Sequence, residues 1–327
     1  MRKGKGIALL AALALVTSLT ACSGTADSKS AANYPSKDLD WTIAFGPGGG
    51  NDIMARTMVK IINDKKLYSG GKIVVENREG GSGATGWGHL SKQKGSGYGI
   101  STTSGSFITT PLQANTGWKP QDFTPVGLFA TDDALFVLPG KSPITSWQQW
   151  VDHAKQKGSV AVGGIGTVNV DFIIHAILAD TAGYKIDYVP FNEEGQLQTA
   201  LLSGSLDGMV SNTGSILGQV QANKVRPLLF TGKQPLPALP QVPTGESLGF
   251  KNLPAMPRGL ILPPDAPQAA TDWWITTMKT VVATPEWREY LKSNYLTEDV
   301  RWGADFGTFL GTTSEEFKRV LTEKGAL

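Results

Sequence analysis

The sequence is poor in the side chains that build metal sites and disulfide frameworks. It has one cysteine, Cys22, so no disulfide can form within the chain and stability must come from packing. Its three histidines, His89, His153 and His175, do not stand at metal-ligand spacing to one another or to the cysteine. We therefore expect no metal centre and interpret the histidines as packed or surface residues of helices.

Motifs of catalysis and nucleotide binding are scarce as well. The chain has no G-x-S-x-G nucleophile elbow and no G-x-x-x-x-G-K-[ST] phosphate loop. Residues 81–86 match G-x-G-x-x-G, but four residues separate them from the preceding predicted strand, which makes this a weak dinucleotide signal. Glu193 and Glu194 are poor acid–base candidates, because adjacent carboxylates rarely converge on one bond. We expect no cofactor and no enzyme activity.

The charge balance gives no reason to expect a nucleic-acid partner. The N-terminal Arg2, Lys3 and Lys5 belong to a segment that we expect to be removed. Without them, 27 basic residues face 28 acidic ones, so the formal charge is near −1. About 290 residues then remain beyond the N-terminal segments, which is enough for two lobes rather than one small core.

Residues 1–22 have the features of an export signal. A basic start precedes an apolar run at 7–19, which is short for a transmembrane helix. The run ends in Leu-Thr-Ala-Cys, a lipobox-like sequence in which cleavage leaves a lipid-modified Cys22 as the first residue. The alternative is an ordinary signal peptide with an incidental cysteine.

Residues 23–36 are rich in Ser, Ala, Lys and Asn and predict a flexible tether. Together with the lipobox, this predicts an extracytoplasmic lipoprotein. Acyl chains on Cys22 would hold it to a membrane, in the periplasm or on the outer face of the cell membrane, without a transmembrane span.

A glycine loop after the first predicted strand is the centre of the functional argument. Residues 41–45 are apolar or β-branched and predict a short buried strand. Residues 46–50 are glycines with one proline, and Asn51 or Asp52 is expected to cap a helix. The apolar face of this helix is Met54, Met58, Ile61 and Ile62. Unpaired N–H groups and the positive end of the helix dipole favour an anion at such a helix start.

The same arrangement recurs later in the chain. Residues 159–162 predict a strand, residues 163–166 read G-G-I-G, and Asn169 and Asp171 precede an apolar helix. If the two loops face each other across a cleft, both helix starts point at one anionic ligand. The alternative is that the glycines only allow tight strand-to-helix turns. Further predicted strands also end in small or polar residues, at 72–76, 98–103, 184–191 and 207–210.

The alternation of strands and helices predicts an α/β fold with two lobes, each a mainly parallel sheet flanked by helices. Residues 126–138 are expected to cross from the first lobe to the second, and residues 225–230 to return. The proline-rich stretch 232–268 is interpreted as loop, followed by helices at 266–283, 284–296 and 313–324. The expected division is 37–132 plus 238–327 for lobe 1 and 133–237 for lobe 2.

These stretches resemble the tripartite tricarboxylate transporter substrate-binding proteins, also called the Bug receptors. The similarity runs from about Tyr34 to the C-terminus. It rests on residues 45–52 with Ala55 and Arg56, then 76–86, 122–126, 164–167, 188–191, and 200–204 with Asp207. The resemblance implies a Venus-flytrap fold that delivers a solute, usually a carboxylate, to a membrane transporter. In that family the backbone N–H groups of the two glycine loops hold the carboxylate.

Two departures from the family pattern bear on the ligand. After the second-lobe glycines this chain has Thr167-Val-Asn169-Val-Asp171, with an acidic residue as in the tricarboxylate-type subgroup. After residue 191 it has Asn-Glu-Glu in place of Lys-Gly-Gly-like residues. Carboxylates there would repel a second anionic group and favour a hydroxyl, an amide or an amine.

We therefore expect a monomeric solute-binding lipoprotein that captures a small organic acid and delivers it to transporter subunits of the tripartite tricarboxylate type. The alternatives are a protein that presents its ligand to a sensor, and an exported α/β enzyme. The candidate ligand contacts are Phe45, Gly46, Gly48, Gly49, Gly50, Asp52, Gly83, Ser104, Ser106, Gly164, Gly166, Thr167, Asn169, Asp171, Phe191, Asn192, Glu193 and Asn212.

Overall fold

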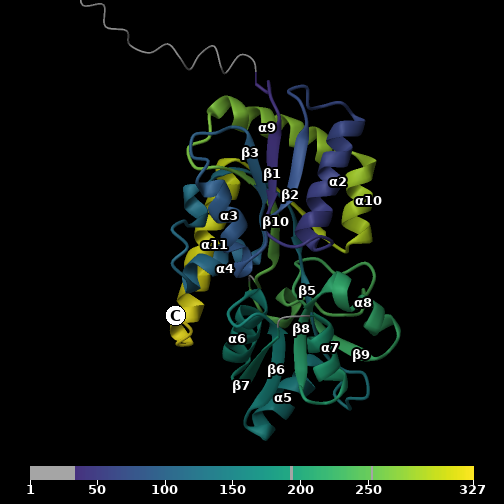
Figure 1. The fold of residues 1–327 in the computed structure, drawn as a ribbon. Coiled ribbons are helices and arrows are strands. Elements are labelled where there is room, and N and C mark those ends of the chain that lie inside the picture. The colour runs from purple at the N-terminus through teal and green to yellow at the C-terminus, as the bar shows by residue number, and fades with distance from the viewer. Residues whose placement is uncertain (1–33, 192–193, 252) are drawn as a thin grey trace, which may run out of the picture.

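The computed structural model describes residues 34–191, 194–251 and 253–327 and contains two β-sheets, one in each lobe (Figure 1). The first sheet has the strand order β11-β4-β10-β3-β1-β2. Its strands are β1 (Leu39–Ile43), β2 (Ile73–Asn77), β3 (Gly99–Thr102), β4 (Thr124–Asp132), β10 (Met256–Leu262) and β11 (Thr297–Trp302). Strands β1, β2 and β3 pair in parallel, whereas β10 pairs antiparallel with β3 and β4, and β11 with β4.

The second sheet has the order β7-β6-β8-β5-β9. Its strands are β5 (Ala134–Pro139), β6 (Val160–Ile165), β7 (Ile186–Phe191), β8 (Gly208–Asn212) and β9 (Val225–Phe230). Strand β6 is parallel to β7 and β8, and β5 is antiparallel to β8 and β9. The predicted two-lobed α/β fold is confirmed, but both sheets are mixed rather than mainly parallel.

Helices cover both faces of each sheet. Figure 1 shows α2 and α10 on one side of the first sheet and α3, α4 and α11 on the other. The helices of this lobe are α2 (Gly50–Asp64), α3 (Ala84–Ser91), α4 (Gly105–Gln113), α9 (Gln268–Val282), α10 (Pro285–Ser293) and α11 (Ala304–Glu323). Those of the second lobe are α5 (Trp147–Lys157), α6 (Val170–Ala182), α7 (Glu194–Leu202) and α8 (Thr213–Gln221).

Apolar periodicity explains how these helices pack. The predicted face of α2 is buried, with Met54, Met58 and Ile62 each 0% exposed in a core that they share with α9 and α10. Helix α5 begins at the N-cap Ser146, whose hydroxyl accepts a hydrogen bond from the Gln149 N–H at 3.3 Å. One core cluster is continuous between the lobes, because residues of α4, α6 and α11 all belong to it.

Two predictions about the return to the first lobe were wrong. Strand β9 stays in the second sheet, where it pairs with β5. The chain returns later through β10, which lies inside the stretch interpreted as loop. Pro257 and Gly259 gave that stretch its loop-like composition. Strand β10 tolerates them because its register with β4 shifts at Arg258/Gly259.

The folded part begins earlier than expected, within the predicted tether. The Tyr34 hydroxyl donates to the Gly97 carbonyl at 2.7 Å and accepts from Trp274 Nε1 at 2.8 Å. Its ring also contacts Tyr98 and Trp273. Among the residues described, no helix is long and apolar enough to cross a membrane. The predicted signal sequence and Cys22 lie outside that part of the chain.

Candidate functional site

The start of helix α2 presents an exposed backbone after β1. Gly48, Gly49 and Gly50 are exposed, and the N-cap Gly49 gives α2 no side-chain cap. Gly48 has a φ of +79°, in the left-handed region where glycine is favoured. The first N–H groups of this 15-residue helix therefore stand at the positive end of its dipole, where an anion is favoured.

The side chain of Asp52 fixes the conformation of this loop by hydrogen bonds. Its buried carboxylate accepts hydrogen bonds from the Gly48 N–H at 3.0 Å, Arg56 Nε at 2.9 Å and Asn77 Nδ2 at 3.0 Å. Burial would raise the pKa of Asp52, but these bonds together lower it. The prediction that Asn51 or Asp52 caps α2 was wrong, because Gly49 is the N-cap. Asp52, a candidate ligand contact, has its carboxylate engaged within the lobe.

A buried arginine lies directly against the start of α2. Arg258 on β10 is 8% exposed, and its Nη2 forms an ion pair with the carboxylate of Asp132 at the end of β4. Nη1 lies 3.4 Å from Asn51 Oδ1, and Nε has no hydrogen-bond partner among the described residues. A Cβ on Gly50 would stand only 2.8 Å from Nη2, so the guanidinium fits here because residue 50 is glycine.

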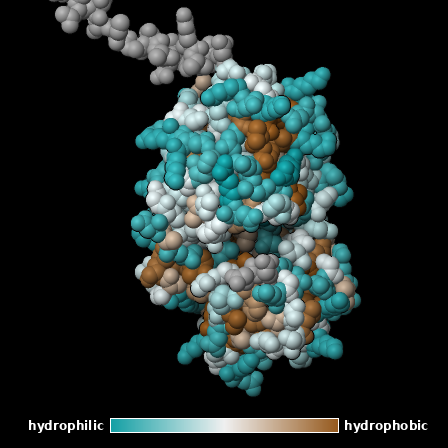
Figure 2. Space-filling model, in the orientation of Figure 1, coloured by the Kyte–Doolittle hydropathy of each residue, from teal (hydrophilic) through white to brown (hydrophobic). Residues whose placement is uncertain are grey.

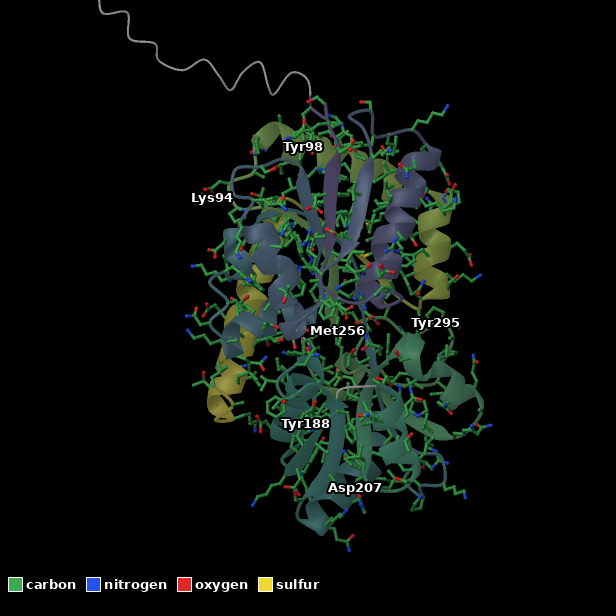
Figure 3. All side chains as sticks on the ribbon, viewed as in Figure 1. Lys94, Tyr98, Tyr188, Asp207, Met256 and Tyr295 are labelled. Atoms are coloured by element: carbon green, nitrogen blue, oxygen red, sulfur yellow. The ribbon has the colours of Figure 1, made fainter. Side chains whose placement is uncertain are left out.

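The starts of α4 and α6 meet where the lobes join. Ser104 is the N-cap of α4, and Asn169 is the N-cap of α6, where its side chain accepts from the Val170 N–H. A Cβ on Gly105 would lie 2.5 Å from Val170 Cγ2 and 3.5 Å from Met256 Cγ. Figure 3 shows Met256 between the two lobes. The start of α2 therefore adjoins Arg258 of β10, and the start of α4 adjoins both Met256 of β10 and the start of α6.

Two more contacts join the lobes near this point. Gln113 Nε2, at the end of α4, donates to the Val168 carbonyl at 2.6 Å. Asn212 Nδ2, at the end of β8, lies 3.6 Å from Met256 Sδ. Figure 2 shows the surface indented between the two lobes.

The β6–α6 loop uses some of its donors internally. The Gly166 N–H donates to the Phe191 carbonyl at 2.9 Å, and the Gly166 carbonyl accepts from the Tyr188 hydroxyl at 2.9 Å. The Ile165 N–H donates to Asp171 Oδ2 at 2.8 Å. Gly166 has a φ of +76°, so it supplies the turn. A ligand at this loop meets the exposed Thr167 and the start of α6 rather than the N–H of Gly166.

Asp171 is the most deeply buried acidic residue of the site. It is 1% exposed, and its Oδ1 has no hydrogen-bond partner in the described part of the chain. Burial, with smaller contributions from the charges of Glu194 and Asp132, raises the pKa of Asp171 to about 7, against the hydrogen bond from the Ile165 N–H, which lowers it. Glu194 itself accepts from Ser211 Oγ at 2.5 Å and from Gln198 Nε2 at 3.0 Å.

The connection between the two sheets at β4 and β5 contains another acidic residue. Asp133 connects β4 to β5, and its carbonyl accepts from both the N–H and the hydroxyl of Thr213. Burial raises the pKa of Asp133 to about 6, against hydrogen bonds from Thr297 and Thr131 that lower it. The backbone of Asp133 is therefore bonded to the start of α8, and its side chain is bonded to the start of β11.

Other candidate contacts pack within the first lobe. The Phe45 ring lies edge-on to Trp87 at a centroid distance of 5.6 Å. Gly83 has a φ of +92°, and a Cβ there would stand 2.1 Å from the Trp87 ring. Gly46 lies beside the Glu79 carboxylate. Ser106 is half-buried in the first turn of α4.

The other candidate contacts belong to the second lobe. Gly164 packs against Asp171. Asn192 and Glu193 lie outside the described residues.

The family model of the tripartite tricarboxylate transporter family receptor matches residues 55–325. The chain belongs to this receptor family. The receptor is 29% identical over 272 residues to the "UPF0065 protein in tcbD-tcbE intergenic region" of Pseudomonas sp. (strain P51), covering 79% of this chain and 78% of that one. It is 25% identical over 260 residues to protein BugT of Bordetella pertussis, covering 77% and 78%.

Solved structures share the receptor's fold. A ligand-free TctC solute binding protein from Polaromonas has a TM-score of 0.78 at 21% identity, covering 89% of this chain and all of that one. MatC from Rhodopseudomonas palustris with bound malate has a TM-score of 0.72 at 18% identity, covering 88% and 100%. An R. palustris protein with adipate has a TM-score of 0.73 at 20% identity, covering 90% and 99%.

Sequence reasoning missed Arg258, Asp132 and Met256. The strand signal around Arg258 is obscured by its Pro and Gly neighbours, and Asp132 interrupts an apolar run without indicating a partner. A buried arginine beside an acidic partner cannot be recognised without the pairing of β10 with β4, which joins residues 126 positions apart.

Proposed function

We propose that this receptor captures one small carboxylate between its lobes and delivers it to a tripartite tricarboxylate-type transporter. The observation that carries the proposal is the start of α2, which has no side-chain cap and lies against one buried guanidinium at the lobe junction, where the starts of α4 and α6 also meet. Relatives of the same fold that hold malate and adipate support a carboxylate ligand. Binding is non-covalent in this proposal, and the ligand leaves unchanged.

The ligand carboxylate would be held by the N–H groups of Gly49 and Gly50, with Arg258 beneath them. The second lobe would close on it with Thr167 and the start of α6. The lobes would move about Asp133 and the segment before β10, where the chain returns to the first sheet.

The test is a thermal-unfolding panel on purified protein lacking residues 1–22. One organic acid should stabilise the folded state, and at a hundred times its dissociation constant the gain is about 2.7 kcal/mol. Replacing Gly50 with a bulky residue should remove the shift, because the side chain would occupy the helix start. If no organic acid shifts the transition, the proposal fails. Chemical conversion of the ligand on long incubation would instead indicate an enzyme.

The proposed localisation is a membrane-anchored lipoprotein outside the cytoplasm. The lipobox-like sequence before Cys22 supports it. Cells fed labelled palmitate should label the wild-type protein, and the Cys22→Ala variant should stay unlabelled and leave the membrane fraction. Equal labelling of both proteins would refute lipidation at Cys22. Size-exclusion chromatography with light scattering tests the proposed monomer.

A further inference from the structure

Buried polar atoms of opposite character remain unpaired on the two sides of the lobe junction. On the first lobe, Arg258 Nε is a donor with no partner in the described chain. On the second lobe, Asp171 Oδ1 is an acceptor with no partner there. Both residues are more than nine-tenths buried, at 8% and 1% exposed. Unpaired buried polar groups are costly, so a partner that supplies both an acceptor and a donor would relieve both.

The two residues belong to one neighbourhood. Arg258 lies two residues after Met256, which adjoins Gly105, and Gly105 is in contact with Val170, the residue before Asp171. The charge of Asp132, the ion-pair partner of Arg258, is close enough to affect Asp171. The two residues therefore flank the place where α4 contacts both β10 and α6.

The charges of this neighbourhood are unequal. Among the described residues, the carboxylates of Asp132 and Glu194 are close enough to Asp171 to raise its pKa. Asp171 and Glu194 each lie in the first turn of a helix of the second lobe. One guanidinium, Arg258, is paired with Asp132. A ligand that brings only carboxylates would add to this negative charge, whereas a ligand with a cationic group would offset it.

We propose that the ligand is an amino carboxylic acid, whose carboxylate lies at the start of α2 beside Arg258 and whose ammonium group is bound by Asp171 and Glu194. This inference rests on the proposed function and specifies its ligand class. Asp171 is well placed for the task because its Oδ2 is fixed by the Ile165 N–H while Oδ1 is left for the ligand. An ammonium held by a fixed carboxylate forms a charge-assisted hydrogen bond, which is stronger than a neutral one.

The experiment compares succinate, malate and aspartate by isothermal titration calorimetry on the protein lacking residues 1–22. These dicarboxylates differ only in carrying hydrogen, hydroxyl or ammonium at one carbon. The propionate, lactate and alanine series repeats the comparison with one carboxylate. Within the series that binds, the ammonium compound should bind at least about tenfold more tightly than the unsubstituted one, as expected for a charge-assisted bond.

Asp171→Asn tests the residue assignment. The amide keeps the shape and can still accept from the Ile165 N–H, so the fold should persist, as thermal unfolding will verify. The preference for ammonium over hydrogen should fall about tenfold or more in this variant. Glu315→Gln, an exposed charge-neutralising change on α11, is the matched control and should keep the wild-type preference.

The outcomes separate the two proposals. If an unsubstituted or hydroxyl-bearing acid binds as tightly as its amino counterpart, the amino-acid inference is overturned while the carboxylate receptor stands. An Asp171→Asn variant with the unchanged preference refutes the role of Asp171. If no acid of either series, and none in the wider panel, binds at all, the proposed function itself fails.

Discussion

Replacing Gly50 with alanine tests the packing beneath the first glycine loop. The new Cβ would stand 2.8 Å from Arg258 Nη2 and 3.1 Å from Cζ, whereas ordinary contact begins at 3.4 Å. The guanidinium must therefore move by about 0.6 Å. This displacement costs free energy, because Nη2 forms an ion pair with the buried carboxylate of Asp132.

The expected cost follows from three effects. Overpacking a well-filled site costs about 1–3 kcal/mol. Full loss of a buried ion pair would cost about 3–5 kcal/mol, but a displacement of this size weakens the pair rather than breaking it. Alanine recovers up to about 1 kcal/mol of helix propensity relative to glycine. We therefore expect Gly50→Ala to lower the free energy of unfolding by about 1–2 kcal/mol.

The assay is equilibrium urea unfolding followed by tryptophan fluorescence. Gly49→Ala is the control, since its Cβ would meet only the Gly46 carbonyl at 3.5 Å and its φ of −74° suits any residue. That variant should stay within about 0.5 kcal/mol of the wild type. In an Arg258→Met background, Gly50→Ala should cost at least about 1 kcal/mol less than in the wild type. Equal midpoints for Gly50→Ala and Gly49→Ala would show that Arg258 does not press on residue 50.

Three further changes test other parts of the structure. Arg258→Met leaves the Asp132 carboxylate buried and unpaired, so urea unfolding should show a loss of about 3–5 kcal/mol, partly restored by adding Asp132→Leu. Because the folded pKa of Asp171 is raised to about 7 from 3.8, the folded state holds a proton that the unfolded state has lost between about pH 4 and 7. Its contribution therefore falls as pH rises through that window, and Asp171→Asn should gain stability relative to the wild type from pH 4 to 7; a constant difference would contradict the pKa. Ser146→Ala removes the cap bond to Gln149 and should cost about 1 kcal/mol in thermal unfolding.

Features controlled by local periodicity were predicted well from the sequence. The buried face of α2 follows from apolar residues at helical spacing, and the start of α5 follows from a serine three residues before a glutamine. Trp147 and Trp150 lie three positions apart on one face of α5, and both are buried. Each of these features depends on residues a few positions apart, which is the range over which a pattern can be seen.

Features that depend on distant pairing were missed. Asp52 looks like a helix cap from its neighbours, but its role is set by Asn77, which lies 25 positions later on β2. Strand β10 looks like loop because it contains Pro257 and Gly259, yet it lies between β3 and β4, with partners from far earlier in the chain. Since β10 carries Arg258, missing the strand also hid the one buried guanidinium of the site.

The direction of the strands explains why the helix starts converge. Strands β1 and β3 run toward the junction in the first sheet, and α2 and α4 begin where they end. Strands β6 and β8 do the same in the second sheet and lead into α6 and α8. In open α/β sheets a ligand binds beyond the carboxyl ends of such strands, and here two sheets present those ends to each other.

This arrangement also explains the position of the buried ion pair. Strand β4 runs toward the junction and ends at Asp132, whereas β10 pairs antiparallel with it and leaves the junction just after Met256. The ion pair of Arg258 and Asp132 thus joins the two connections between the lobes, immediately beneath the helix start where an anion is favoured. An anionic ligand that binds this guanidinium would change the contact between β4 and β10, the strands that lead to the two connections. Its binding would therefore be coupled to the relative position of the lobes.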